Sequence, residues 1–209
     1  MDLRRLSKRA ALIIVAAVLV IGVVALWPHG TAYRTASTAP RPTPIAPKPR
    51  PTCVTSGGAF VPYTATITGV GTVRVLPVPR PPGDAAGTPP ETNTGKRMMA
   101  WDAPGLKPNG SSTGAVVTDA HSYPDGSALG NTFMAKLHQG SLVELRGDGG
   151  TACYRIVSQT VYDQDHVPTY PFSTDGPARL SIIICYWPRL GPGNWQNRMI
   201  WEARPVRAA

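Results

Sequence analysis

The chain has 209 residues, 23 of them proline, and a formal net charge of +9. The charge is uneven: residues 1–56 hold eight Lys/Arg and one Asp, whereas residues 57–209 hold thirteen Lys/Arg and eleven Asp/Glu. Because the basicity belongs mainly to the N-terminal quarter, and no basic stripe interleaved with aromatic residues follows it, we expect no nucleic-acid partner.

The N-terminus has the pattern of a membrane anchor. Residues 1–9 contain four Lys/Arg, and residues 10–27 form an uncharged apolar run of 18 residues, the short end of what spans a bilayer. The basic flank predicts a cytoplasmic N-terminus of nine residues, a single transmembrane helix and a large extracellular part. A cleaved signal peptide is the alternative, with a weak cleavage-like site at Ser37-Thr38-Ala39. In both cases the folded part lies outside the cytoplasm.

A proline-rich stretch follows the apolar run. Seven of the 24 residues from 28 to 51 are proline, and only one is glycine. Such a composition favours an extended polyproline-like conformation of roughly 3.1 Å per residue. We therefore predict that residues 28–56 are a linker between the membrane and a folded domain at 57–209.

The rest of the chain has the pattern of an all-β domain. Short runs rich in Val, Ile, Thr and Tyr recur between Gly, Pro and Asp. We expect strands at 60–70, 72–78, 114–120, 141–145, 154–163, 180–186 and 199–204, and one short helix at 129–137. Many short strands separated by turns favour a barrel or a sandwich. The proline-rich stretch 77–90 is expected to be an irregular surface loop.

Three residues with chemical potential are predicted at strand ends. His121 ends the run 114–121, Cys185 ends the run 180–185, and Arg198 begins the run 198–203. A thiolate is a strong nucleophile, an imidazole transfers protons near neutral pH, and a guanidinium binds developing negative charge. Together these groups predict an acyl-transfer site.

The order His, Cys, Arg, with separations of 64 and 13 residues, resembles the sortases, which are membrane-anchored cysteine transpeptidases of Gram-positive cell surfaces. The resemblance covers roughly residues 60–204. The segment Trp101-Asp102-Ala103-Pro104-Gly105 is similar to the segment before the histidine in the actinobacterial class E and F enzymes. This resemblance implies an eight-stranded β-barrel with a short helix, one strand more than the sequence pattern identifies.

The resemblance also implies a mechanism. Cys185 would attack the carbonyl between Thr and Gly in a sorting signal of the Leu-Pro-x-Thr-Gly type. His121 would protonate the leaving amine and later accept a proton from the incoming one, and Arg198 would hold the substrate and the oxyanion. The acceptor would be an amine of a peptidoglycan precursor or of a pilin. No metal and no organic cofactor are expected.

Two positions depart from the family pattern, and five further side chains are of types that can bind or react. Ala120 stands where the family has Gly, and Ile184 stands where it has Thr, which predicts an altered substrate groove. Asp119 either orients His121 or is an exposed strand-end carboxylate. His138 is expected to face solvent, and His166 lies in a loop that flanks the groove in sortases. Cys53 and Cys153 could pair outside the cell, but the sequence leaves this open.

Other readings of the thiol remain. Cys185 taken alone could be an ordinary buried cysteine. A sortase-like barrel without turnover, acting as a cell-surface binding module, is the alternative function. An L,D-transpeptidase would place its cysteine in a Ser-x-Gly-Cys setting, which residues 182–185 do not match. A papain-like peptidase would have its cysteine before its histidine, and here the order is reversed.

Overall fold

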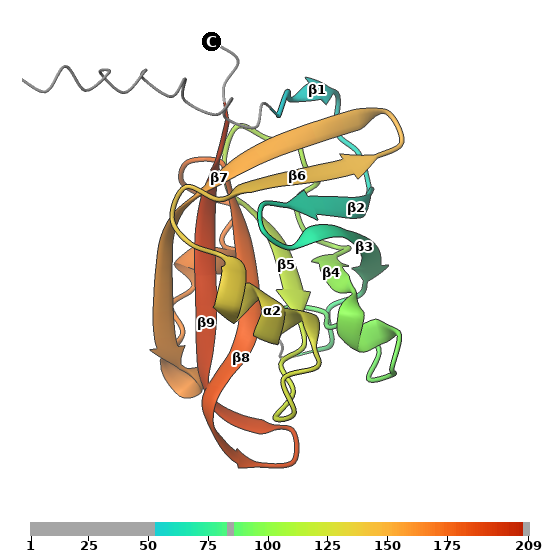
Figure 1. Cartoon of the computed structure of the whole chain (residues 1–209). Coiled ribbons are helices and arrows are strands. Elements are labelled where there is room, and N and C mark those ends of the chain that lie inside the picture. The colour runs from blue at the N-terminus through green and yellow to red at the C-terminus, as the bar shows by residue number, and fades with distance from the viewer. Residues whose placement is uncertain (1–52, 83–85, 207–209) are drawn as a thin grey trace, which may run out of the picture. The chain divides into compact units, whose positions relative to one another are not determined.

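Alternating apolar and polar residues give the strands one face that can be buried. The sheet that these strands form is closed into a barrel (Figure 1). The structure is a computed structural model and describes residues 53–82 and 86–206. Its strands are β1 (Ser56–Gly57), β2 (Pro62–Ile67), β3 (Gly71–Val78), β4 (Met99–Asp102), β5 (Ala115–Ala120), β6 (Leu142–Gly147), β7 (Gly150–Asp163), β8 (Arg179–Gly191) and β9 (Asn194–Pro205).

Eight of these strands form a closed ring. The hydrogen-bonded order is β7-β6-β2-β3-β4-β5-β8-β9, and β9 pairs back onto β7. The two-residue β1 pairs only with the start of β7. Most neighbours are antiparallel, but β3 with β4 and β5 with β8 are parallel. The eight-stranded barrel with one short helix, α2 (Leu129–Lys136), is thus confirmed.

Each of the seven strands predicted from the sequence overlaps a strand of the barrel. The one that the pattern missed is β4, which has only four residues, all of them buried. A short strand buried on both faces shows no alternation, so periodicity cannot detect it. Residue 101 was recognised only through the resemblance to a family segment.

Inward-facing side chains of all eight strands fill the barrel. The helix α2 adds Phe133, whose ring meets that of Trp201 edge-on at a centroid distance of 6.3 Å. The largest fully buried apolar side chains are Trp101, Trp201, Phe133, Ile67, Met99, Leu145, Ile156, Leu180, Ile182, Ile184 and Val75. This continuous core makes the strand positions around it rigid.

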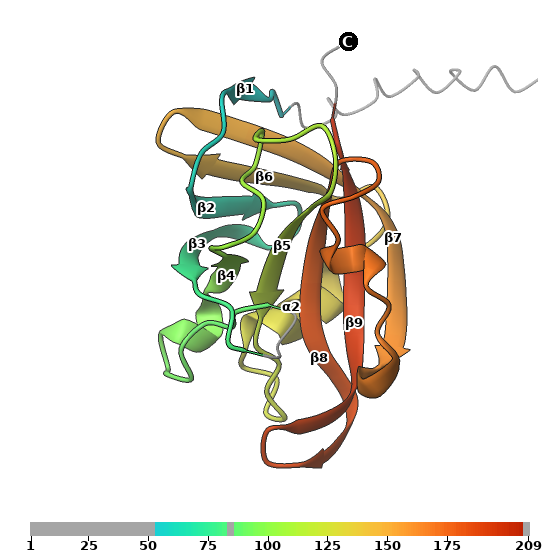
Figure 2. The ribbon, with the colours of Figure 1, turned by 180° about the vertical axis from the view of Figure 1, so that it is seen from behind.

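A second, smaller cluster covers the outer face of β5, β8 and β9. It consists of Ala115, Val117, Ile183 and Ile200. The loop between β7 and β8, which contains the short 3-10 helices η3 (Gln164–His166) and η4 (Tyr170–Phe172), packs against it and is seen in front of β8 and β9 in Figure 2. The candidate site lies on this outer cluster, which forms its floor.

The described part of the stretch 77–90 is irregular and mostly exposed after β3, as expected, but some of it packs on the barrel. Its start belongs to β3, and Ala86 packs on the outer cluster. Gly87 and Pro89 are buried. This connection from β3 to β4 crosses the outer face of β5, which gives its backbone a role in the candidate site.

Two of the expected strand ends lie inside longer strands. β8 continues past Cys185 to Gly191, with irregular register after Tyr186, and β9 already begins at Asn194. The resulting β8–β9 hairpin projects beyond the barrel at the end opposite β1 (Figure 1). The sequence suggested strand ends because Pro188 and Gly191 interrupt the apolar run there.

The expected anchor at 10–27 and the linker as far as residue 52 lie outside the described residues. Among the helices that the structure describes, none has the length and apolar character needed to cross a bilayer.

Candidate active site

Strand register brings the three predicted site residues into one row. In the parallel pair β5–β8, Ala120 lies opposite Ile184 as the last pair of the ladder, so His121 follows β5 at the end where Cys185 follows Ile184. In the antiparallel pair β8–β9, Cys185 lies directly opposite Arg198. Because side chains alternate along a strand, Cys185 and Arg198 share the outer face with Ile183 and Ile200. The three residues, called the row below, therefore lie at the same end of β5, β8 and β9, with the thiol and the guanidinium opposite each other.

His121 is half-buried and held by its surroundings. Its Nε2 lies 2.5 Å from the carbonyl oxygen of Pro89, and because a carbonyl only accepts, Nε2 carries the proton. Its own carbonyl accepts a hydrogen bond of 2.8 Å from the amide of Gly130. A Cβ on Gly130 would lie 2.6 Å from that carbonyl oxygen, so only glycine allows α2 to begin so close to the histidine.

Two segments near His121 contact each other through Lys96, which lies between β3 and β4, and the loop that follows β5. Lys96 Nζ donates to Ser127 Oγ at 3.0 Å and lies 5.7 Å from the centre of the Tyr123 ring. The β3–β4 connection is thus linked to the loop that follows β5. Sequence reasoning missed both this link and the Pro89 contact, because neither segment has a periodic pattern.

Cys185 is the only free cysteine among the described residues, and it is half-buried. Burial raises the pKa of its thiol to about 11, the positive charge of Arg198 acts in the opposite direction, and the charge of Asp119 adds to the rise. The resting side chain is therefore a neutral thiol at physiological pH. A nucleophile forms there only when a base takes the proton or a bound group stabilises the thiolate.

Arg198 is fixed by oxygen atoms that carry no formal charge. Its Nη1 donates to the carbonyls of Trp195 and Asn197 at 3.0 and 3.1 Å, and its Nη2 donates to Gln164 Oε1 at 3.3 Å. None of the ion pairs among the described residues includes it. Its charge is held in place beside the thiol without being neutralised by a carboxylate.

Asp119 differs from the expected exposed carboxylate. It is 8% exposed, and burial raises the pKa of its carboxyl to about 8, against the opposing charge of Arg198. Among the described residues its side chain makes no hydrogen bond to His121, so the predicted orienting contact is not observed. The sequence could not show this burial, because the covering segments come from distant parts of the chain.

The two departures from the family pattern face the barrel interior. Ala120 and Ile184 are 1% and 0% exposed and belong to the inner core. The expectation that Ile184 alters the substrate groove is therefore wrong. Period-two alternation from Cys185 places residue 184 on the opposite face, and that signal was present in the sequence.

The two other histidines in the described part of the chain make no hydrogen bond with Cys185 or Arg198. His138 is exposed as expected, and its Nδ1 lies 3.0 Å from the Gln139 carbonyl. His166 is also exposed, and its Nδ1 is 3.3 Å from Asp163 Oδ1. The pKa of Asp163 is lowered, mainly by the hydrogen bond from the Asp165 amide and also by His166. No described contact links His166 with the thiol.

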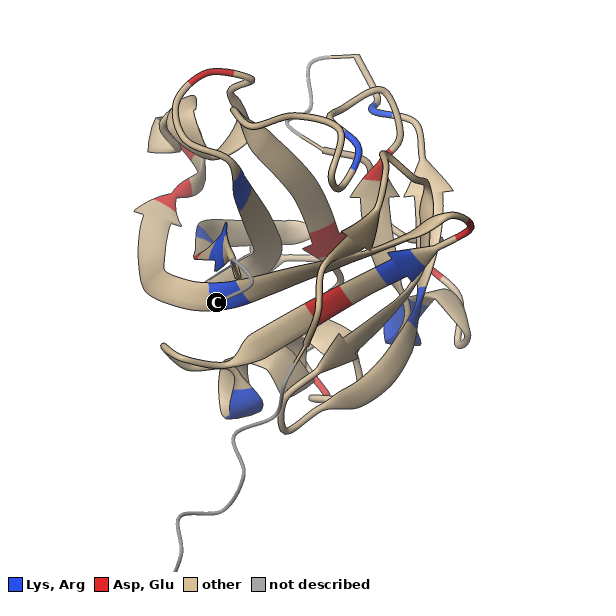
Figure 3. Ribbon diagram, turned by 90° about the horizontal axis from the view of Figure 1, so that it is seen from above, with Lys and Arg blue, Asp and Glu red and all other residues tan. Residues whose placement is uncertain are grey.

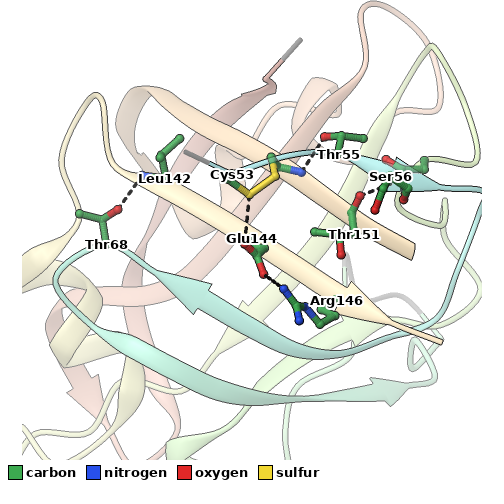
Figure 4. Close-up of a disulfide and its surroundings, with 10 residues drawn as sticks. Cys53, Thr55, Ser56, Thr68, Leu142, Glu144, Arg146 and Thr151 are labelled. Carbon is green, nitrogen blue, oxygen red and sulfur yellow. Dashed lines mark hydrogen bonds and ion pairs between the residues drawn. A yellow bond between two sulfur atoms is a disulfide. The ribbon is translucent and has the colours of Figure 1, made fainter. Parts of the chain in front are cut away.

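Cys53 and Cys153 form a disulfide that joins the end of the linker to β7 (Figure 4). Cys153 is fully buried, and Glu144 Oε2 lies 3.3 Å from Cys53 Sγ. These three residues are the one group in the described part of the chain with metal-ligand density. Because the two sulfur atoms are bonded to each other, no thiolate is left there for a metal.

Lys and Arg are interspersed with Asp and Glu when the described part is seen from above (Figure 3). An example is the 2.7 Å ion pair of Arg146 with Glu144 on β6. This distribution differs from the one-sided basic surface that a polyanion partner requires.

No protein-family model matches the chain, and no curated protein matches it by sequence. Its structure is similar to that of sortase A from Corynebacterium diphtheriae (TM-score 0.52, 12% identity), covering 74% of this chain and 63% of that one. It is also similar to sortase C-1 from Actinomyces oris (0.52, 16%, covering 69% and 71%). A third is sortase C1 from Streptococcus agalactiae (0.51, 14%, covering 70% and 67%).

The chain has the sortase fold. The identities are far below the level at which activity can be transferred, and the chain spans less than two thirds of the diphtherial sortase A. The matches carry the names of sortases A and C, so they give the architecture but no class E or F assignment.

Proposed function

We propose that this protein is a membrane-anchored cysteine transpeptidase of the sortase type, with His121, Cys185 and Arg198 as its catalytic residues. The observation that supports the proposal is the strand register, which brings these three residues to the same end of β5, β8 and β9 and sets Cys185 opposite Arg198. A nucleophile, a proton carrier and a fixed cation in adjacent positions are what acyl transfer through a thioester requires.

The first half of the reaction forms a thioester. Substrate binding displaces water from the groove, and Cys185 passes its proton to His121 as the sulfur attacks the carbonyl between Thr and Gly. Arg198 still has unused N–H donors after its three hydrogen bonds, and these stabilise the oxyanion. His121 then gives its proton to the leaving glycine amine, and the C–N bond breaks.

The second half releases the acyl group. An acceptor amine loses a proton to His121 and attacks the thioester carbonyl, and the sulfur leaves as a thiolate that is reprotonated. The donor is a sorting signal of the Leu-Pro-x-Thr-Gly type, and the acceptor is an amine of a peptidoglycan precursor or a pilin. The Nε2 contact with Pro89 leaves Nδ1 of His121 as the ring atom available for these transfers.

The proposal places the domain 57–209 outside the cell, held to the membrane by residues 10–27. The disulfide supports this placement, because such bonds persist in oxidising compartments. A fully extended linker from residue 28 to residue 51 would span about 75 Å, enough to lift the domain off the bilayer. It joins the barrel at β7 through Cys53.

A binding module without turnover is the second candidate. Two observations favour it: the raised pKa keeps the thiol protonated, and Nε2 of His121 is already bonded to the Pro89 carbonyl. Neither group is thus in a reactive state before a ligand binds. The two functions differ in what Cys185 does with a substrate: the enzyme forms a covalent bond and exchanges the leaving peptide, whereas the binding module holds a ligand without cleaving it.

The test uses the full chain in detergent with a panel of Leu-Pro-x-Thr-Gly and Leu-Ala-x-Thr-Gly peptides and a glycine-based amine. The transpeptidase is expected to yield the amine-exchanged peptide, and Cys185→Ala is expected to yield none. Binding of a peptide without product, by a protein whose thiol still reacts with iodoacetamide, would instead assign the module.

A further inference from the structure

Asp119, which carries a buried carboxyl, lies two residues before His121 in the chain. Asp119 pairs with Ile183 on β8 and with Ala100 on β4, which places it on the outer face, diagonal to Cys185. It therefore shares the floor of the site with Ile183 and Ile200. An apolar residue would complete that floor, and a carboxyl there costs desolvation free energy.

Asp119 has no local partner that repays this cost. Its Oδ1 is buried without a hydrogen-bond partner among the described residues. The facing position on β4 is Ala100, and the crossing segment offers Ala86 and the carbonyl of Pro89, none of which is charged. Of the acids near η3, Asp163 accepts a hydrogen bond from the backbone amide of Asp165 and lies 3.3 Å from His166 Nδ1.

Two titratable or charged groups interact electrostatically with Asp119, namely Arg198 on β9 and Cys185 on β8. His121 follows it by two residues without a hydrogen bond to it, and Arg80 of the crossing segment is paired with Asp102. Arg198 acts on the ionisation of both Asp119 and Cys185, and the charge of Asp119 acts on that of Cys185. One fixed cation therefore faces two groups that can become anions. In a site shielded from water, a single cation stabilises only one of them well.

We propose that Asp119 is a positioning residue of this site, a buried carboxyl that competes with the Cys185 thiolate for the positive charge of Arg198 and so controls how readily the nucleophile forms. The inference rests on the proposed function for its biological meaning. The electrostatic coupling between the Asp119 carboxyl and the Cys185 thiol does not depend on that function, and it can be measured on the thiol without any sorting signal.

The coupling has a direction. Below about pH 8 the carboxyl holds its proton, and the charge of Arg198 remains available to a thiolate or an oxyanion. Above that pH the carboxylate takes up the charge of Arg198 and repels a second anion. The thiolate population is therefore expected to rise less steeply with pH above the ionisation of the carboxyl than below it.

The experiment compares the rate of iodoacetamide alkylation of Cys185 from pH 6 to pH 10 in the full chain and in Asp119→Asn. At pH 9 the variant is expected to react roughly tenfold faster, because removal of a like charge lowers the thiol pKa by about one unit. Below pH 7 the two rates should converge, because the wild-type carboxyl is then neutral. A structural role alone would not produce this pH-dependent divergence.

The matched control is Asp148→Asn, which removes an exposed carboxylate from the β6–β7 turn far from the row and should leave the profile unchanged. Coincident profiles for Asp119→Asn and the wild type, or a shift of the variant to higher pH, would overturn the inference. If transpeptidation is absent but the profiles diverge, the inference stands and only the proposed function fails.

A second measurement needs no folded Asp119 variant. Infrared difference spectra of the wild type should show a protonated carboxyl at pH 6.5 that disappears as the pH rises through about 8. In Arg198→Gln this midpoint should rise, because the cation that favours the carboxylate is gone. A midpoint that is the same with and without the guanidinium would refute the competition.

Discussion

The inner and outer faces of β5, β8 and β9 are built from alternate residues of the same strands, but they differ in burial and in residue type. Inward, Ala120, Ile184 and Met199 are almost completely buried in an apolar core. Outward, one step away along β8 and β9, Cys185 and Arg198 are half-buried. The difference shows that the two faces of these strands have separate roles. The apolar inner face stabilises the fold and fixes the spacing of the strands, and the outer face carries reactive groups that are only partly buried.

The largest effect should come from the outer face. Cys185→Ala is expected to lower transpeptidation by roughly ten-thousandfold or more, because no other described group can form the thioester. Thermal unfolding should change little, since the side chain is only half-buried. A variant that keeps substantial peptide exchange would place the nucleophile elsewhere.

Arg198→Lys tests whether the fixed guanidinium matters beyond its charge. We expect a loss of roughly 10²- to 10³-fold in kcat/KM, because an ammonium cannot both keep the three hydrogen bonds to Trp195, Asn197 and Gln164 and meet an oxyanion. Steady-state kinetics on a cleaved peptide measures this. If lysine supports wild-type turnover, charge alone is sufficient.

The inner face should give the opposite result. Ile184→Ala is expected to lower the free energy of unfolding by about 2–5 kcal/mol, since it opens a cavity in a core where the side chain is fully buried. Denaturant titration measures this loss, and kcat per folded molecule should stay close to that of the wild type. A selective loss of turnover in a stable Ile184→Ala protein would mean that the two faces are not separated as described.

Asp119 should show an effect on stability that depends on pH and vanishes in acid. Because its folded pKa is raised from 3.8 to about 8, the folded state retains the proton more strongly, so this group's stabilising contribution is complete below about pH 4 and is lost as the pH rises to 8. Asp119→Asn should therefore gain stability relative to the wild type over this range, by about 2–5 kcal/mol at pH 8. Denaturant titrations at pH 4, 6 and 8 measure the difference, and a difference that is constant with pH would contradict the assignment.

The sequence was sufficient wherever alternation or spacing determines the structure. The seven strands and the helix at 129–137 follow from local pattern. His121, Cys185 and Arg198 were predicted from an order and spacing that resemble a family, and the register sets Cys185 opposite Arg198. The inward direction of Ile184 was also accessible by counting two along the strand from Cys185. The resemblance supplied the eighth strand, which is too short and too buried for a pattern of its own.

The remaining features depend on contacts between distant segments. The burial of Asp119 and the contact of His121 with Pro89 arise because the β3–β4 connection crosses β5. The disulfide joins residues 100 positions apart, and with three cysteines the sequence could not decide the pairing. No window of local sequence contains such information, since it depends on how the barrel closes.

The most direct test of the central claim is to trap the acyl intermediate. The full chain is incubated with a Leu-Pro-x-Thr-Gly peptide and no added amine, quenched in acid and analysed by intact-mass and peptide-level mass spectrometry. The account predicts an adduct on Cys185 equal to the peptide up to its threonine, which disappears when an amine is added before quenching. An unmodified Cys185 in a protein that binds the peptide would contradict the claim that the row of three side chains is an acyl-transfer site.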